Sequence, residues 1–478
     1  PTWGDIFSGN IHRTKHYYNL CDNILSGKHT VVIGLPACGK TTLMMQVASE
    51  FSFAGHKLVM SAPSEEKASL VAKKIDGERA LIFIDNFTDS IDSFHFLATT
   101  PNIILVGFDR EYNFGIVSHK INLNRFNVLD ISDVSREDVQ HILELFPPRL
   151  RRTAPRNFDR RKGINPTIFD VIEAHIIRHS LRDRYRDAIV ELRRTNELLA
   201  ELLVCLCYVY KCRTPLSFDM LYAFLRDQIN TYEDIYHLCD RLGALVEEYS
   251  GVLADENQDY YIPRSTIIAE AVIDQSPHDL LKNVISKFHN QVSPSRICRF
   301  DIFRRTAYDA DLMKKAFLEW TDGIQFYEKM YERDQSPYLL QQGALYLAAK
   351  NRYDEAFSWI DKATVLSRGQ VFSIRNSHAI LLFKANIHRP SNDPTVQATL
   401  TQSMDILTDC YTRGSQKTYH ALVFGEQAVQ YWNVFGDELA KTYLETAAHW
   451  LADEKKKNDW NRKVNEILKI IINILAKL

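Results

Sequence analysis

The sequence predicts an α/β domain with a parallel sheet, followed by a mainly helical chain that ends in stacked helix pairs. Three observations support this fold class. Between residues 1 and 150, short apolar runs of strand length alternate with helical stretches. A turn with two glycines directly follows the first of these runs. From residue 339 onward, apolar residues recur at helical spacing between short turns.

Length and composition limit the class of protein. A chain of 478 residues predicts several domains, and 45% hydrophobic with 25% charged residues exclude a mainly disordered or fibrous chain. With a net charge of -2, no overall field attracts the protein to nucleic acid or anionic lipid. No apolar run is long enough for a bilayer, and the eight cysteines lack metal-site spacing. We therefore expect a cytoplasmic protein with reduced thiols.

Four apolar runs are the candidate strands of the central sheet. Each is rich in Val, Ile, Leu or Phe and carries few charges, which is typical of strands covered on both faces. They are Thr30–Ile33, Lys57–Ser61, Ala80–Ile84 and Asn102–Val106.

The turn after the first strand fits the phosphate-binding pattern G-x-x-x-x-G-K-[ST]. It lies between a strand and an apolar helix, which is the context that this pattern requires. Glycines let the backbone approach phosphates, the amides and the helix N-terminus point positive charge at them, and Lys40 adds a full charge. The predicted nucleotide-binding residues are Gly34, Ala37, Cys38, Gly39, Lys40, Thr41 and Thr42. ATP or ADP with Mg²⁺ is the expected ligand.

A second strand, residues 81–85, ends in the carboxylate of Asp85 and is typical of a Walker B strand. Many buried strands also end in Asp as a turn residue, but its position after the phosphate loop favours Mg²⁺ binding by Asp85 together with Thr41. Many ATP-hydrolysing proteins with such a strand carry a second acid at the next position, which is Asn86 here. We therefore expect slow ATP turnover unless Asp89 substitutes for that acid.

The fourth strand ends in Asp109 and Arg110, near the carboxyl edge of the sheet where ligands of open α/β folds bind. Arg110 is predicted either to contact the γ-phosphate, with a catalytic role beside Lys40 and Asp85, or to pair with Asp109 or Glu111 on the surface.

The middle of the chain begins with a capping box, Ser135 to Asp138, which predicts a helix. The basic segment Arg149–Lys162 is consistent with a nucleic-acid stripe, although a solvated loop or a protomer interface is favoured because it holds one aromatic residue. Asn165 and Pro166 then suit the cap and first position of another helix.

The next region has the element order of a winged helix. The expected helices are Glu197–Tyr210, Phe218–Asp227 and Tyr232–Glu248, and the expected strands lie near Val252–Ala254 and Tyr260–Ile262. Acidic residues in the third helix disfavour DNA binding by this region.

Two amphipathic helices, Leu339–Ala349 and Tyr353–Thr364, resemble the tetratricopeptide pattern with one extra residue in the turn. Later pairs keep the helical period, so a short α-solenoid that binds a partner is predicted. The pairs are Ile374–Asn386 with Thr395–Thr412, and Tyr419–Val434 with Glu438–Leu451. The apolar stretch Ile467–Leu475 contains Lys469 and is too short for a membrane anchor, which favours a capping helix.

In this order of motifs, the chain resembles the STAND class of P-loop NTPases, most closely the bacterial antiphage members. The resemblance implies four regions, a nucleotide-binding domain at 1–148, a helical lid at 149–196, a winged helix at 197–275 and tetratricopeptide-like repeats at 276–478. It also implies that Arg13 borders the nucleotide, that Pro166 packs near the adenine and that Arg110 is the sensor arginine. Relatives often carry a His that touches the ADP phosphate, whereas this chain offers Ser265, so Arg264 is expected to take over.

Family membership implies a nucleotide-gated switch. A pathogen protein, for example from a phage, would bind the repeats and favour an ATP-bound state that forms homo-oligomers and activates an effector domain. Because the chain begins with Pro1, we expect that effector in a preceding segment. The alternatives are a winged-helix DNA-binding ATPase or transcription regulator and, less favoured, a small-molecule kinase.

Overall fold

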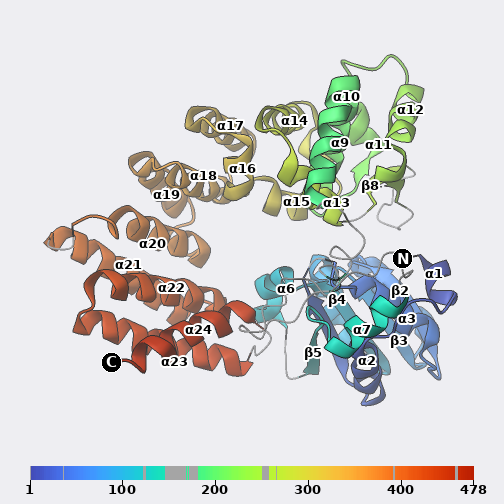
Figure 1. Ribbon diagram of the computed structural model, residues 1–478, viewed down its shortest axis with the longest axis horizontal. Coiled ribbons are helices and arrows are strands. Elements are labelled where there is room, and N and C mark those ends of the chain that lie inside the picture. The colour runs from blue at the N-terminus through green and yellow to red at the C-terminus, as the bar shows by residue number, and fades with distance from the viewer. Residues whose placement is uncertain are drawn as a thin grey trace. The chain divides into compact units, whose positions relative to one another are not determined.

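A computed structural model describes residues 2–35, 37–121, 125–145, 168, 171, 181–249, 258–264, 266–390, 393–457 and 461–478. The chain divides into two compact units (Figure 1). The first contains Pro1–Ser276 together with Gln291–Ile302, and the second contains Pro277–Asn290 together with Phe303–Leu478.

The first unit contains a five-stranded sheet with the order β2-β3-β4-β1-β5, in which all neighbouring strands are parallel. The strands are β1 (His29–Gly34), β2 (His56–Ser61), β3 (Ala80–Asp85), β4 (Ile103–Arg110) and β5 (Phe126–Asp130). The predicted parallel sheet is confirmed. Strand β5 escaped the sequence analysis because Asn127 and Asp130 interrupt its short apolar run at the edge of the sheet.

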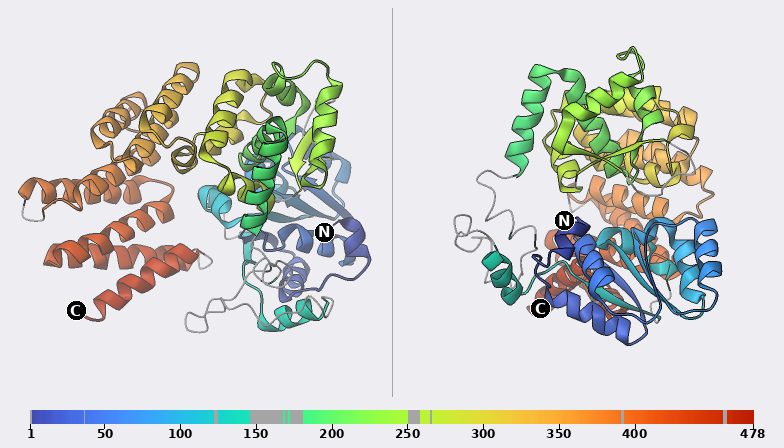
Figure 2. Two further views of the ribbon diagram at one scale, coloured as in Figure 1. Left: turned by 45° about the horizontal axis from the view of Figure 1, so that its top comes forward. Right: turned by 90° about the vertical axis from the view of Figure 1, so that its right-hand side faces the viewer.

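Helices cover both faces of this sheet (Figure 2). On one face, α2 (Lys15–Leu25) and α3 (Lys40–Glu50) bury apolar side chains against the strands. On the other face, a cluster of aromatic rings joins the turn after β3, α5 (Ile91–Thr99), α6 (Glu111–Val117) and β5. Gly107 of β4 lies close to two of these rings. A Cβ added to it would lie 2.8 Å from Phe87 and Phe94.

The remaining described helices of the sheet region are α1 (Trp3–Phe7), α4 (Glu65–Ile75) and α7 (Arg136–Leu145). The capping interaction predicted for α7 is present, because the amide of Asp138 donates to Ser135 Oγ at 3.0 Å. The basic segment Arg149–Lys162 lies outside the described residues.

A smaller antiparallel sheet with the order β6-β8-β7 follows in the same unit. Its strands are β6 (Leu216–Ser217), β7 (Val246–Glu248) and β8 (Tyr260–Pro263), and the helices of this region are α9 (Leu181–Thr195), α10 (Glu197–Lys211), α11 (Phe218–Leu225), α12 (Glu233–Leu242) and α13 (Thr266–Gln275).

Helix α12, which was predicted as the third helix of the winged helix, is shorter than predicted. It ends at Leu242, before Gly243 with φ +51°, and residues 246–248 form β7 where the sequence indicated a continuing helix. A left-handed glycine ends a helix readily, which explains the difference. The expected strand Val252–Ala254 lies outside the described residues.

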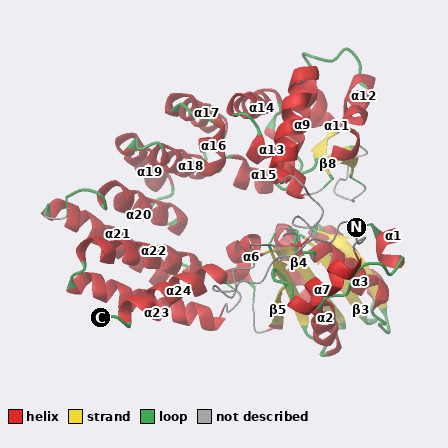
Figure 3. Cartoon of the chain, in the orientation of Figure 1, coloured by secondary structure: helices red, strands yellow, loops and turns green. Residues whose placement is uncertain are grey.

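The second unit is helical throughout its described part (Figure 3). Its helices are α14 (His278–Gln291), α15 (Phe300–Ala307), α16 (Ala310–Ala316), α17 (Trp320–Arg333), α18 (Pro337–Ala349), α19 (Tyr353–Leu366), α20 (Phe372–Asn386), α21 (Pro394–Arg413), α22 (Lys417–Phe435), α23 (Glu438–Lys457) and α24 (Arg462–Leu475). The predicted tetratricopeptide-like pair corresponds to α18 and α19. Its small residue Gly343 faces Trp359, whose ring atoms would lie 2.5 Å from an added Cβ.

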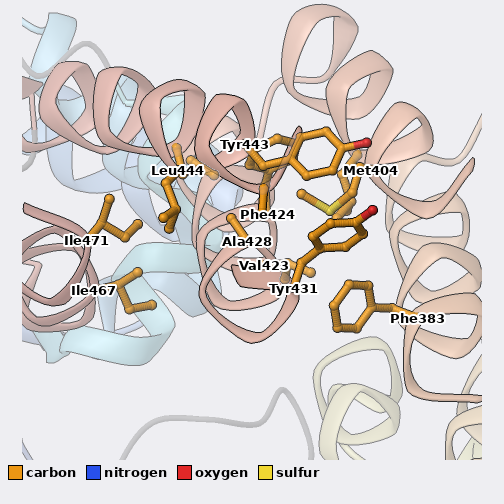
Figure 4. Close-up of a cluster of buried hydrophobic side chains, with 14 of the residues drawn as sticks. Phe383, Met404, Val423, Phe424, Ala428, Tyr431, Tyr443, Leu444, Ile467 and Ile471 are labelled. Atoms are coloured by element: carbon orange, nitrogen blue, oxygen red, sulfur yellow. The ribbon is translucent and has the colours of Figure 1, made fainter. Parts of the chain in front are cut away.

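Helices α20 to α24 share one apolar core (Figure 4). Phe383, Met404 and Tyr431 lie inside it, and Ile467 and Ile471 of α24 pack against Gly425 and the neighbouring side chains. This packing accounts for the apolar C-terminal stretch as part of a core. Among the residues that the structure describes, no helix is long and apolar enough to cross a membrane.

Candidate functional site

The strand order brings the predicted site residues to one edge of the sheet. Strand β4 lies between β1, which leads into the phosphate loop, and β3, which ends in Asp85. In the register of the sheet, Arg110 pairs with Gly34 and Phe108 pairs with Asp85. The last residues of β4 are therefore placed between the glycine loop and Asp85.

The conformation of the loop depends on its glycines. At Gly34, a Cβ would lie 2.5 Å from the buried Cys38 Sγ, so a larger residue would displace the loop. At the N-cap of α3, Gly39 has φ +93°, and a Cβ there would lie 3.0 Å from Ile168. No side chain caps α3 among the described residues, which leaves its first amides directed at the loop.

Lys40 and Leu35 hold the loop together. Lys40 Nζ donates to the carbonyls of Gly34 at 3.0 Å and Leu35 at 2.7 Å. The amide of Leu35 donates to Ser132 Oγ at 3.1 Å, and this hydroxyl donates to Asp130 at the end of β5. The ammonium group of Lys40 is thus held at the loop by hydrogen bonds to backbone carbonyls of the loop.

The other predicted loop residues lie at the same place. Ala37 adopts φ +58°, a left-handed conformation that suits a tight turn. Thr41 is exposed and Thr42 is partly exposed on the first turn of α3. Their hydroxyls are therefore accessible to a ligand bound at the loop.

Asp85 ends β3 and accepts a hydrogen bond from the amide of Asn86 at 3.0 Å. Burial, and then the negative charge of Asp109, raise the pKa of Asp85 to about 6. A cation beside this carboxylate would relieve both effects, because it favours the ionised form. The environment of Asp85 therefore suits a metal ligand.

Asp109 is fully buried beside this carboxylate. It accepts hydrogen bonds from Thr88 Oγ1 at 2.5 Å, Asn113 Nδ2 at 2.8 Å, the amide of Arg110 at 2.7 Å and Arg213 at 3.1 Å. Burial by itself would raise the pKa of Asp109, but the guanidinium of Arg213 and these hydrogen bonds outweigh it and lower the pKa. Asp109 is therefore ionised and fully hydrogen-bonded.

Two arginines from beyond the parallel sheet reach this edge. Arg213 contacts Asp89 Oδ1 at 3.1 Å as well as Asp109. Arg299 lies 3.9 Å from the other oxygen of Asp89 and donates to the carbonyl of Ala62 at 3.1 Å. The sequence analysis missed both arginines, since neither belongs to a motif and only the fold brings them here.

Asp89 does not lie open at the site, contrary to the role considered for it in the absence of a second acid at Asn86. Its side chain is 4% exposed and is paired with Arg213 and Arg299. In this arrangement the carboxylate is engaged by cations, so it cannot orient water.

Arg110 lies at the expected edge, but its partner differs from those predicted. Its NH1 donates to Glu270 Oε1 of α13 at 3.4 Å, and the side chains are about one-third exposed. This contact joins Arg110 to a helix that lies far along the chain.

Two other residues implied by the resemblance have described contacts with residues outside the loop. Arg13 Nε donates to Glu50 at the end of α3 at 2.6 Å, and the guanidinium lies over the ring of Tyr17. Arg264 is exposed after β8, and its amide donates to Leu245. Neither contact includes the phosphate loop. Pro166 lies outside the described residues.

The residues present fit a magnesium nucleotide. The loop backbone, Lys40 and the N-terminus of α3 suit phosphates, whereas Thr41 and Asp85 offer oxygen ligands for Mg²⁺. Among the described residues no group of three His, Cys, Asp or Glu could hold a metal ion. A magnesium ion at this loop needs no such group because the nucleotide and water complete its coordination.

No protein-family model matches the chain, and no curated protein matches its sequence. Among solved structures, it is similar to the crystal structure of a Signal Transduction ATPase with Numerous Domains (STAND) protein with a tetratricopeptide repeat sensor from Pyrococcus horikoshii. The identity is 13%, and the alignment covers 94% of this chain and 85% of that chain. The TM-score of 0.29 is too low to transfer a site or an activity.

Proposed function

We propose that the chain binds ATP or ADP with Mg²⁺ at the loop after β1 and acts as a nucleotide-dependent switch. One observation supports this most strongly. The strand order places Lys40, Asp85 and the end of β4 at one edge of the sheet, although they are far apart in the sequence. A parallel sheet binds ligands at this edge.

The residues have distinct roles in this proposal. The loop amides and Lys40 bind the phosphates, Thr41 and Asp85 hold Mg²⁺, and Mg²⁺ neutralises charge on the β- and γ-phosphates when it is bound. Arg110 is a candidate for contact with the γ-phosphate, which would compete with its hydrogen bond to Glu270. Exchange of these two partners gives nucleotide a way to alter the contact between β4 and α13.

The helical second unit suggests how the switch is controlled. We propose that its helix pairs bind a protein trigger and that the ATP-bound state forms homo-oligomers, as in an antiphage sensor with a separate effector domain. The closely packed pair α18 and α19 supports this reading, since paired helices of this kind form binding surfaces in repeat proteins.

Calorimetry of the chain with ATP and ADP in the presence of Mg²⁺ tests nucleotide binding. We expect binding by the natural chain and none by Lys40→Ala, with Lys57→Ala as a control because this lysine donates to Phe51 outside the loop. Absence of binding by the natural chain would refute the proposal. Mass measurement with ATP and a candidate trigger then tests oligomer formation.

Regulation of DNA is the second candidate, and no observation on the described residues favours it. Helix α12 carries Glu233 and Asp234 in its first turn, which would repel phosphates.

A further inference from the structure

We propose that Arg213 and Arg299 form a latch that withholds Asp89 from the nucleotide, and that release of this latch lets Asp89 orient the water that attacks ATP. The inference rests on the proposed nucleotide site and adds its regulation. It names a water-orienting group in a chain that carries Asn86 where a second acid would follow Asp85.

The position of Asp89 supports this role. It lies in the turn Phe87–Ser90 that directly follows β3, four residues after Asp85. Arg213 spans Asp89 and Asp109 at 3.1 Å each, so all three side chains lie at the carboxyl edge of β3 and β4. A movement of the arginines would thus uncover a carboxylate beside the proposed γ-phosphate position.

The contacts explain why Asp89 is inactive in the latched form. Arg213 engages Oδ1, Arg299 faces Oδ2 at 3.9 Å, and the side chain is 4% exposed. In the latched form, each oxygen of the Asp89 carboxylate therefore faces a guanidinium group. Because the side chain is 4% exposed, it is closed to water from solvent.

The latch residues are held in unusual backbone conformations. Arg213 has φ +65° in the loop before β6, and Arg299 has φ +57° just before α15. Non-glycine residues adopt this region of backbone conformation infrequently. At Arg213 this conformation also ends helix α10, because the amide of Arg213 donates to the carbonyl of Tyr210 and that of Thr214 donates to Val209.

The chain path connects Arg299 to the helical unit. Residues Gln291–Ile302 belong to the first unit but are joined at both ends to segments of the second, Pro277–Asn290 and Phe303–Leu478. Arg299 also donates to the carbonyl of Ala62, and the amide of Ala62 donates to the backbone carbonyl of Asp85. A change in the helical unit can therefore reach the nucleotide site through this covalent link.

The released form performs ordinary hydrolysis. The oxygen of the water forms a bond to the γ-phosphorus while the bond from that phosphorus to the β,γ-bridging oxygen breaks. ADP leaves with the electron pair of that bond, and the proton of the water passes through Asp89 to solvent. A positioned general base contributes about 100-fold to 10,000-fold to the rate of such a step.

The test compares latch variants with a matched control. Arg299→Gln weakens the latch and leaves the ion pair between Arg213 and the buried Asp109 intact. Arg213→Gln would leave Asp109 buried without its cation and can prevent folding, so Arg213→Gln with Asp109→Asn serves as the second variant. Arg296→Gln is the control, because Arg296 lies in the same segment and pairs with Asp219, a partly exposed residue outside the latch.

We expect ATP turnover to rise at least threefold in Arg299→Gln and about tenfold in the double variant, and to stay unchanged in Arg296→Gln. Addition of Asp89→Asn should return both rates to that of the natural chain or below. Amide hydrogen exchange over residues 291–302 should become faster in Arg299→Gln and stay unchanged in Arg296→Gln. This measurement tests the latch independently of ATP turnover.

Three results would overturn the latch: unchanged turnover in folded latch variants, a rise that persists with Asp89→Asn, or unchanged exchange in Arg299→Gln. Calorimetry separates this outcome from failure of the proposed function. If the natural chain binds Mg-ATP and the variants fail these tests, only the latch is wrong. If the natural chain binds no nucleotide, the site itself is wrong.

Discussion

Acid should destabilise the helical unit through a buried histidine. His420 on α22 is fully buried, and its Nδ1 lies 2.9 Å from Asn376 Oδ1, which accepts its hydrogen. Burial lowers the pKa of His420 to about 4. The native protein therefore holds a neutral imidazole, whereas the unfolded chain takes up a proton near the ordinary pKa of about 6.5.

The sign and size of the effect follow from these two pKa values. Since the folded pKa lies below the unfolded one, stability is lost as the pH falls below about 6.5, and the loss levels off below about 4. Between pH 7 and pH 5, the difference in proton uptake at His420 amounts to about 2 kcal/mol of unfolding free energy. His289, with a pKa lowered to about 3 by burial and then by Arg333, adds a loss of similar size.

The experiment is urea unfolding of the natural chain and of His420→Gln at pH 7 and pH 5. Tryptophan fluorescence reports mainly the helical unit, because Trp320, Trp359, Trp432, Trp450 and Trp460 lie in it and only Trp3 lies outside. The variant should lose about 2 kcal/mol less than the natural chain between the two pH values. His388→Gln is the control, because His388 is exposed at the end of α20.

Only the pH dependence decides the outcome, since His420→Gln also alters the hydrogen bond to Asn376 and can lower stability at every pH. If His420→Gln and the natural chain lose equal stability between pH 7 and pH 5, then the imidazole of His420 is not held neutral in the folded protein.

Three further changes test the loop and the repeats. Lys40→Ala should abolish binding of ATP in calorimetry while leaving the unfolding midpoint close to that of the natural chain, because its contacts lie within the loop. Gly34→Ala should weaken nucleotide binding at least tenfold, since its Cβ would overlap Cys38 Sγ, and retained affinity would contradict this loop geometry. Gly343→Ala should lower the unfolding free energy by about 1–3 kcal/mol through the clash with Trp359, as measured by urea unfolding.

The sequence predicted the features that depend on local pattern. Apolar runs of strand length identified β1, β2, β3 and β4, and helical periodicity identified α10 and the helices from α18 onward within a few residues of their ends. Helices α13 to α17 went unnamed, although α14 and α17 are as long as the predicted α19. The turn at Gly243 that ends α12 depends on backbone conformation more than on periodicity.

The residues of the candidate site also fall into two groups, those that local sequence pattern predicts and those that only the fold brings together. The position of the glycine loop and of Asp85 at one edge of the sheet was predictable, because these residues are adjacent or directly end a strand. Arg213 and Arg299 were not predictable, because each follows an ordinary helix or turn and reaches its carboxylates only through the fold. The partner of Arg110 was missed for the same reason, since Glu270 lies 160 residues away.

The missed residues change the expected behaviour of the site. The motifs alone predict a slow ATPase because Asn86 takes the place of a second acid. The structure offers a different cause, since Asp89 is present near the site but is engaged by two guanidinium groups. A slow rate would then reflect a carboxylate held in reserve. The two explanations differ experimentally, because removal of Arg299 should raise the rate if the acid is withheld and leave it unchanged if no acid is available.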